Sequence, residues 1–97
     1  MRDRIRAGRY IVSQHAFIES ARDEVEDADI RSAVFNGAII ESYPDDKRGA
    51  SVLVSGTTST GRPLHVVVGV AYEEAVIITV YLPTPPKWTS PSERGGS

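Results

Sequence analysis

The chain has 97 residues, of which 40% are hydrophobic and 25% charged, and its formal net charge is −2. This length favours one domain with one core, and the slight acidic excess argues against a surface built mainly to bind phosphate backbones. Cysteine is absent, which excludes disulfide scaffolds, iron–sulfur clusters and cysteine-based zinc sites. Because no apolar run approaches the ~18 residues of a membrane span and no secretory signal is visible, we expect a cytoplasmic protein that does not contact a membrane.

The first part of the chain predicts helices. Residues 1–8 predict a short helix that ends at a glycine, and "RYIV" after it is interpreted as an extended link. Ser13 is a typical N-cap residue for a helix over residues 14–22. Residues 23–37 predict another helix, because apolar residues recur at helical spacing and an Asn-Gly pair ends the pattern. The acidic residues that crowd the start of this segment are Asp23, Glu24, Glu26, Asp27 and Asp29.

The second part of the chain predicts strands. Short apolar runs alternate with turn residues, and the short connections imply antiparallel hairpins. "PLHVVVGV" and "AVIITVYL" are apolar at nearly every position, so we expect central strands with helices packed on one side. The expected fold class is α+β, with two to three N-terminal helices packed on a four-stranded antiparallel β-meander. The expected strands are residues 38–43, 50–58, 63–70 and 75–82.

The end of the chain is rich in proline, serine and glycine. Proline cannot donate to a sheet ladder, so we expect residues 1–83 to form a single domain and residues 84–97 to form a tail. Trp88 is expected to fold back against the sheet, and the chain after it is expected to be disordered.

His15 is the first candidate for chemistry. It lies in the first turn of the helix capped by Ser13, where free backbone N–H groups favour anions. An imidazole exchanges protons near neutral pH and can act as a general acid or base. The alternative is a surface or capping histidine without a chemical role.

Arg62 and His65 stand at the start of "GRPLHVVVGV". A guanidinium binds phosphate or carboxylate in a fork. The two residues differ in strand parity, however, so they face opposite sides unless Pro63 bends the chain. The alternative is an arginine in a turn and a partly buried histidine in the sheet.

Thr79 and Tyr81 share one face of the last strand. A register that pairs His65 with Tyr81 places the three side chains on the same face, and a shift of one residue separates them. That register needs a three-residue loop, "YEE", which contains no glycine, so the sequence leaves the register open. The alternative is that Thr79 and Tyr81 are ordinary strand formers.

No motif for a bound cofactor is visible. Two histidines far apart in a chain without cysteine form no recognised metal-ligand spacing. "SGTTSTGR" lacks the lysine and the following helix of a phosphate-binding loop. We therefore expect neither a metal nor another cofactor.

The order of several short motifs resembles the domain of unknown function 4258 (DUF4258) family. The motifs are "RYIVSQHA", "DIRSAVFNGAIIESYPDD", "GRPLHVVVGV", "VIITVYLP" and a late tryptophan, from about Arg9 to Trp88. This family is similar to RelE/ParE-type toxins and is grouped with barnase-like, EndoU-like, colicin-like and RelE-like ribonucleases. The resemblance implies a RelE-like α+β fold and a metal-independent endoribonuclease that acts as the toxin of a type II toxin–antitoxin pair. Its partners would be a cognate antitoxin and RNA, including mRNA on the ribosome.

The family's short motifs coincide with the candidate residues. "S-x-H-A", "G-R-P-L-H" and "T-x-Y-x-P" fall on residues 13–16, 61–65 and 79–83. One departure lies between the two main helices, where Glu24 stands at a position that is usually glycine and Arg22 is the only arginine. The expected catalytic residues are His15, His65 and Tyr81, and the expected substrate contacts are Ser13, Arg62 and Thr79.

Two other functions remain as alternatives. A non-catalytic protein-binding module of the same fold is favoured by the acidic balance and by the altered segment around Glu24. A poison of DNA gyrase is the other alternative, because some ParE-like proteins act in that way.

Overall fold

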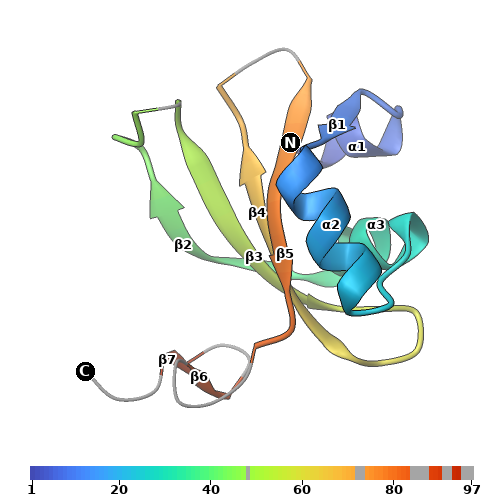
Figure 1. Ribbon diagram of the computed structural model, residues 1–97. Coiled ribbons are helices and arrows are strands. Elements are labelled where there is room, and N and C mark those ends of the chain that lie inside the picture. The colour runs from blue at the N-terminus through green and yellow to red at the C-terminus, as the bar shows by residue number, and fades with distance from the viewer. Residues whose placement is uncertain (48, 72–73, 84–87, 91–92, 95–97) are drawn as a thin grey trace.

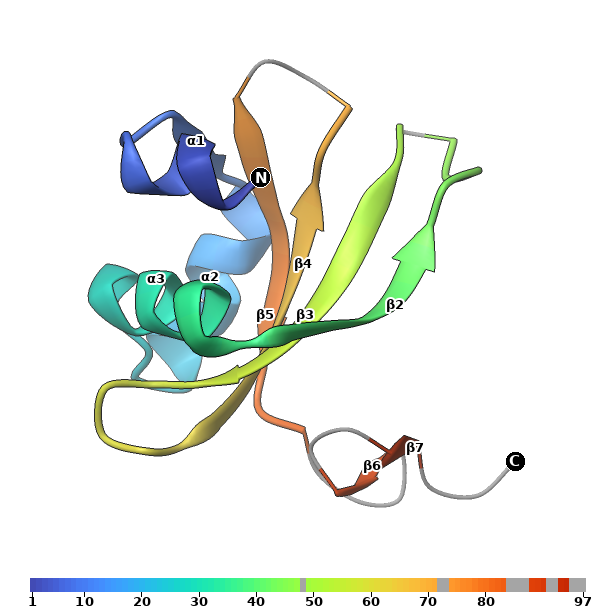
Figure 2. The ribbon, with the colours of Figure 1, turned by 180° about the vertical axis from the view of Figure 1, so that it is seen from behind.

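The chain folds into a helical layer packed on one face of a sheet, as Figures 1 and 2 show from opposite sides. In the part of the chain that this computed structural model describes, there are three helices: α1 (Arg2–Arg6), α2 (Gln14–Arg22) and α3 (Asp27–Asn36). The described residues are 1–47, 49–71, 74–83, 88–90 and 93–94.

The main sheet contains five strands, of which four are antiparallel neighbours. Their order across the sheet is β1-β5-β4-β3-β2. The expected α+β class is therefore confirmed, whereas the four-stranded meander is wrong. The strands are β1 (Tyr10–Val12), β2 (Ala38–Tyr43), β3 (Ser51–Thr57), β4 (Pro63–Gly69) and β5 (Ala75–Tyr81).

The additional strand is β1, the segment interpreted as an extended link. It runs parallel to β5, with Tyr10 opposite Ala75 and Val12 opposite Ile77. A parallel neighbour is not joined by a hairpin, so no turn motif in the sequence points to this pairing. The pairing gives β5 a neighbour on each side, so β5 is an interior strand of the sheet, as expected from "AVIITVYL".

The two longer helices begin at side-chain caps. The Ser13 hydroxyl accepts a hydrogen bond from the Ala16 N–H at 3.0 Å, which confirms Ser13 as an N-cap. The helix predicted over residues 23–37 begins later, at Asp27, where the side chains of Glu26 and Asp29 form a capping box. The preceding residues turn instead, because Glu24 adopts a left-handed conformation with φ of 54°, which an α-helix does not contain.

The hydrophobic core lies between the helices and the sheet. It combines the inward face of each helix with alternate residues of the central strands. Helix α3 approaches β3 so closely that a Cβ at Gly56 would lie 2.0 Å from the Ala33 carbonyl oxygen. Residues of the core include Ile5, Ala16, Ile30, Ala33, Val34, Val54, Leu64, Val66, Val68, Ala75, Ile77 and Val80.

The register of β4 and β5 changes along the hairpin. His65 lies opposite Tyr81 and Val67 opposite Thr79, but Val68 lies opposite Ile77. One residue of β5 has no partner at this irregularity. The register of the pairs near the loop is therefore shifted by one residue relative to the register at His65. Loop length therefore could not determine which residue faces His65.

Short strands also occur near the end of the chain. β6 (Trp88–Ser90) pairs antiparallel with β7 (Glu93–Arg94). The Trp88 side chain and residues 91–92 and 95–97 lie outside the described residues, so the expected packing of Trp88 and the expected disorder after it stay predictions, as does the division at residue 83. None of the described helices is long and apolar enough to cross a membrane.

Candidate functional site on the open face of the sheet

The candidate site lies on the face of the sheet opposite the helices. Leu64 and Val66 belong to the core beneath the helices, and side chains alternate along a strand. His65 therefore points to the other face, which we call the open face. Its side chain is nevertheless fully buried, with 0% exposure, so a substrate can reach the imidazole only through a neighbouring group.

Tyr81 is the neighbour that meets His65. The His65 Nδ1 atom and the Tyr81 hydroxyl oxygen lie 3.1 Å apart, within hydrogen-bonding distance. The Tyr81 ring meets the imidazole edge-on, with centroids 5.1 Å apart and planes at 65°. Tyr81 is only partly buried, so the contact links a buried imidazole to a side chain that is partly exposed.

Rows of side chains cross the open face from strand to strand. Tyr81, His65 and Ser55 form one row on β5, β4 and β3. Thr79 begins the next row, which ends at Glu41 on β2; the residues of that row are Thr79, Val67, Leu53 and Glu41. Thr79 is half-buried and shares the face with Tyr81, as its spacing predicts.

Sequence analysis missed three polar residues of this face. Ser55 lies opposite His65, and the Tyr43 hydroxyl donates a hydrogen bond to Glu41 Oε1. The spacing of two in "ESY" indicates that Glu41 and Tyr43 share a face. Which face they share depends on the register shift between Ile39 and Glu41, and no local signal in the sequence predicts that shift.

His15 lies at the edge of the sheet, outside the open face. Its ring is 68% exposed, and its Nε2 atom lies 3.4 Å from Glu19 Oε1. The same oxygen accepts a hydrogen bond from the Val80 N–H at 3.0 Å. Glu19 therefore holds His15 beside the segment of β5 that carries Thr79 and Tyr81, but no hydrogen bond joins His15 to His65.

Ser13 also binds the edge of β5. Its hydroxyl donates to the Ile78 carbonyl oxygen at 2.9 Å while it caps α2. Ser13 and Glu19 together satisfy backbone groups of β5 beyond the end of β1. Both residues thus position α2 against the strand.

Arg62 lies on the helical side of the molecule, apart from His65. Its guanidinium donates to the carbonyl oxygen of Asp23 at 3.1 Å and to that of Glu24 at 2.8 Å. These carbonyl groups follow the last turn of α2, where backbone acceptors lack partners within the helix. The opposite parity of Arg62 and His65 is confirmed, and Pro63 does not bring the two side chains together.

Asp29 completes the polar cluster near Arg62. Its carboxylate accepts hydrogen bonds from the Glu26 N–H at 3.0 Å and from the Ser59 hydroxyl at 3.1 Å. The hydrogen bond from Glu26 holds the pKa of Asp29 below its ordinary value of 3.8, with smaller contributions from Ser59 and the Arg62 charge, although burial acts in the opposite direction. This cluster stabilises the junction of α2 and α3.

The open face offers a proton-transfer pair. A hydroxyl on a partly exposed side chain, in contact with an imidazole, can pass a proton to a substrate and recover one from the ring. Within the described ranges, no three histidine, aspartate or glutamate side chains gather as metal ligands would.

Comparison with known proteins identifies one family. A family model with the description "Domain of unknown function (DUF4258)" matches residues 12–82, from β1 to the end of β5. No curated protein and no solved structure shows a significant match to the chain.

Proposed function

Because the chain belongs to the DUF4258 family, which is named for its unknown function, we propose its activity from the geometry: a metal-independent endoribonuclease that acts on the open face of the sheet. The observation that carries this proposal is the contact between His65 Nδ1 and the Tyr81 hydroxyl at 3.1 Å. The α+β layers with a mostly antiparallel sheet also support a place among RelE-like ribonucleases.

The proposed reaction is the cleavage of RNA by its own 2′-hydroxyl. The 2′-oxygen forms a bond to the adjacent phosphorus, and the bond from phosphorus to the 5′-oxygen breaks. A base takes the proton from the 2′-hydroxyl, and an acid gives a proton to the departing 5′-oxygen. The products are a 2′,3′-cyclic phosphate and a free 5′-hydroxyl, and no metal or other co-reactant enters the balance.

Tyr81 is the proposed acid, because it is the partly exposed member of the pair, whereas His65 is fully buried. As Tyr81 gives its proton to the 5′-oxygen, His65 Nδ1 supplies another proton to the tyrosine oxygen. Thr79 shares this face, and in this proposal its hydroxyl donates a hydrogen bond to the phosphate.

His15 is the proposed base. It is exposed and lies beside the segment of β5 that presents Thr79 and Tyr81, so a nucleotide across the sheet edge would meet both groups. Glu19 Oε1 lies 3.4 Å from His15 Nε2 and holds the ring in this position. Ser13 and Arg62 take no part in this scheme, because both side chains bind backbone groups of the protein.

Substitution of Tyr81 by phenylalanine tests the proposal, because it removes only the hydroxyl. We expect Tyr81→Phe to slow cleavage of a labelled RNA in EDTA by about 10²–10⁴-fold, the usual contribution of a general acid. The matched control is Tyr10→Phe, which removes a hydroxyl bonded to Asp27 at 2.7 Å on the helical side and should leave the rate unchanged. RNA with a 2′-O-methyl group at the cleavage position should stay intact.

Two results would overturn the ribonuclease. One is that neither free RNA nor ribosome-bound mRNA is cleaved; the other is that Tyr81→Phe cleaves at the wild-type rate. Inhibition of DNA gyrase while RNA stays intact would instead identify a gyrase poison.

We also propose that the ribonuclease is the toxin of a type II pair neutralised by an antitoxin. Expression of the chain alone should then arrest growth, and co-expression of the neighbouring reading frame should restore it. Tyr81→Phe should remove the toxicity without affecting the amount of folded protein.

A protein-binding module without catalysis is the second candidate. It is favoured by Arg62, whose guanidinium binds carbonyl oxygens, and by the complete burial of His65. Harmless expression of a folded chain that binds a partner but cleaves no RNA would support this candidate over the enzyme.

A further inference from the structure

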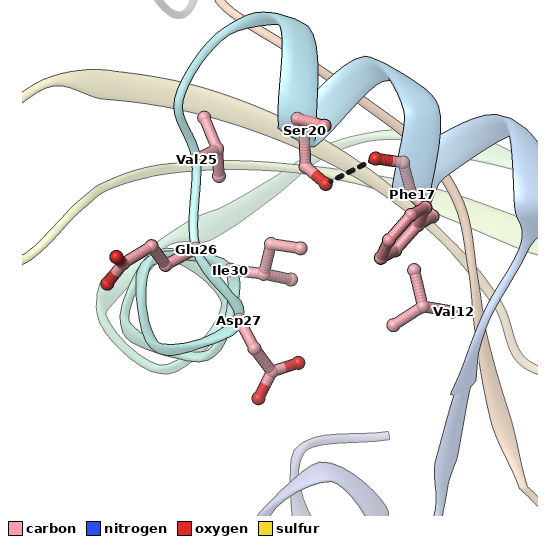
Figure 3. Close-up of a pocket in the computed structure, with 8 residues that line it drawn as sticks. Val12, Phe17, Ser20, Val25, Glu26, Asp27 and Ile30 are labelled. Carbon is pink, nitrogen blue, oxygen red and sulfur yellow. Dashed lines mark hydrogen bonds between the residues drawn. The ribbon is translucent and has the colours of Figure 1, made fainter.

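An apolar hollow lies on the helical side of the molecule, between β1, α2 and the start of α3. Figure 3 shows Phe17, Val12 and Ile30 turned toward one another across it. The hollow measures about 430 Å³, and its lining residues are Val12, Phe17, Ser20, Ala21, Val25, Glu26, Asp27 and Ile30. It is separate from the open face and takes no part in the proposed reaction.

Phe17 makes the hollow unusual as a protein surface. Its side chain is 65% exposed, while Val25 and Ile30 at the hollow are only 6% and 2% exposed. The neighbouring Ile18 is also half exposed. A large aromatic side chain at the border of an apolar hollow is typical of the anchors that stabilise protein interfaces.

The rim of the hollow is acidic. Glu26 and Asp27 line it, and in Figure 3 their carboxylates point away from its apolar centre. Asp27 is held at the rim by the Tyr10 hydroxyl at 2.7 Å. Residues 23–29 contain five carboxylates and no basic residue. Arg31 lies near the Tyr10–Asp27 pair, but the carboxylates outnumber the nearby basic groups, so this side of the groove carries a net negative charge.

A second, more polar hollow continues the first along the α2–α3 junction. The two share Ser20, Ala21, Val25 and Glu26, so they form one elongated groove. Glu24 and Asp29 extend the acidic lining into the second hollow, where Arg62 is already bound to carbonyl oxygens. The groove therefore joins an apolar end to an acidic end.

We propose that this groove is a docking surface for a positively charged, amphipathic segment of a partner protein. An apolar side chain of the segment would pack against Phe17, Val25 and Ile30, and lysine or arginine side chains beside it would meet the carboxylates of Glu24, Glu26 and Asp27. The acidic rim disfavours nucleic acid and anionic membranes, because both would bring negative charge to negative charge. The proposal does not depend on the activity proposed for His65 and Tyr81.

The probe for this surface is a display library of random 16-residue peptides, selected on the whole wild-type chain and then tested as synthetic peptides. We expect the selected peptides to combine a large apolar residue with nearby lysine or arginine. Phe17→Asp should weaken their binding by at least about tenfold, as expected for an interface anchor. Ile39→Asp is the matched control, because Ile39 is a similarly exposed apolar residue on β2, and binding should be unchanged.

Charge and fold are tested with further variants. Asp27→Asn should weaken binding about two- to fivefold and reduce its dependence on salt, because a rim charge contributes modestly. Phe17→Ala provides a milder loss of the anchor should the aspartate disturb α2, and circular dichroism checks that each variant is folded.

Several outcomes would overturn the docking proposal. The first is that the selection enriches no peptide, and the second is that the selected peptides contain no basic residues. The third is that the peptides bind wild type, Phe17→Asp and Phe17→Ala equally well. Concentration-dependent dimerisation that Phe17→Asp abolishes would show that a second copy of the chain occupies the groove, which also contradicts a separate partner. RNA cleavage is not measured in any of these assays, so their failure leaves the ribonuclease proposal unaffected.

Discussion

The Arg62 guanidinium binds the carbonyl oxygens of Asp23 and Glu24, and its backbone N–H binds the Thr58 hydroxyl at 3.1 Å. Two segments that are distant in sequence, residues 23–24 and 58–62, thus meet at Arg62. A helix ends with carbonyl groups that lack intrahelical partners, and a planar cation with several donors can satisfy two of them at once. The same fork geometry that makes arginine a candidate for phosphate binding therefore also suits it to bind the carbonyl groups at the C-terminal end of a helix.

The hydrogen bonds of Arg62 to the end of α2 should contribute to the stability of the fold. We expect Arg62→Ala to lower the free energy of unfolding by about 1–3 kcal/mol, because hydrogen bonds from a charged donor are lost. The matched control is Arg22→Ala. Arg22 is an exposed arginine in the last turn of α2, and its substitution should change the free energy of unfolding by less than about 0.5 kcal/mol. Urea denaturation measures both values.

Catalytic assays separate the two interpretations of Arg62. If the residue supports the fold alone, folded Arg62→Ala protein should cleave RNA at the wild-type rate. A normal unfolding curve combined with a large loss of cleavage would show that Arg62 binds the substrate after all.

At the scale of elements, the helices and the sheet are joined where small residues allow close approach. Gly56 of β3 lies under Ala33 of α3, and a Cβ there would lie 2.0 Å from the Ala33 carbonyl oxygen and 2.7 Å from its carbonyl carbon. Both atoms belong to the backbone, so no side-chain rotation relieves the contact. The absence of a side chain at Gly56 therefore determines how closely α3 packs on the sheet.

The element-scale prediction follows from this contact. We expect Gly56→Ala to lower the free energy of unfolding by about 3 kcal/mol or more, because an overpacked core must shift its backbone. Gly61→Ala is the control: Gly61 has φ of 86° and no atom within 4 Å of the added Cβ, so only the backbone conformation is strained, at about 1 kcal/mol.

Thermal unfolding followed by circular dichroism distinguishes the two glycines. A Gly56→Ala protein with the same midpoint as Gly61→Ala would contradict the close contact of α3 with β3.

The carboxylate of Asp29, in the capping box of α3, makes the stability of the whole domain depend on pH. The Glu26 N–H holds the pKa of Asp29 below its ordinary value of 3.8, and Ser59 and Arg62 contribute in the same direction. The folded chain thus binds the Asp29 proton less readily than the unfolded chain does. The stabilisation by the ionised carboxylate is complete above about pH 4 and is lost as the pH falls through the lowered pKa.

The whole-molecule prediction is an acid-sensitive fold. We expect the free energy of unfolding to decrease from pH 4 to pH 2, and we expect a smaller decrease in Asp29→Asn, which has no carboxylate to protonate. At pH 7 that variant should be less stable than wild type by about 1 kcal/mol, because the charged acceptor of the capping box is lost. Urea denaturation across this pH range is the measurement.

Asp45→Asn is the control, because Asp45 is exposed in the connection between β2 and β3. This variant should follow the wild-type pH dependence. An Asp29→Asn variant that loses as much stability between pH 4 and pH 2 as wild type would contradict the role assigned to Asp29.

Most local elements of this protein were predictable from the sequence alone. Helical spacing and the capping hydroxyl of Ser13 identified α2, and apolar runs between turn residues identified β2 to β5, because these features depend on neighbours in the chain. Parity along β4 also separated Arg62 from His65 correctly, since alternation is a property of any strand.

Which distant groups meet depends on the tertiary fold. The parallel pairing of β1 with β5 and the register shifts near Glu41 and Val67 arise from contacts between remote segments, so no local pattern contains them. The shift near Val67 places Tyr81 opposite His65. The shift near Glu41 brings Glu41 and Tyr43 to the open face, where His65 also lies. Of the residues on the open face, His65, Thr79 and Tyr81 were predictable from the sequence, whereas Ser55, Glu41 and Tyr43 were not. The geometry of the site was not predictable either, because one residue of slippage in a strand exchanges the two faces of a sheet.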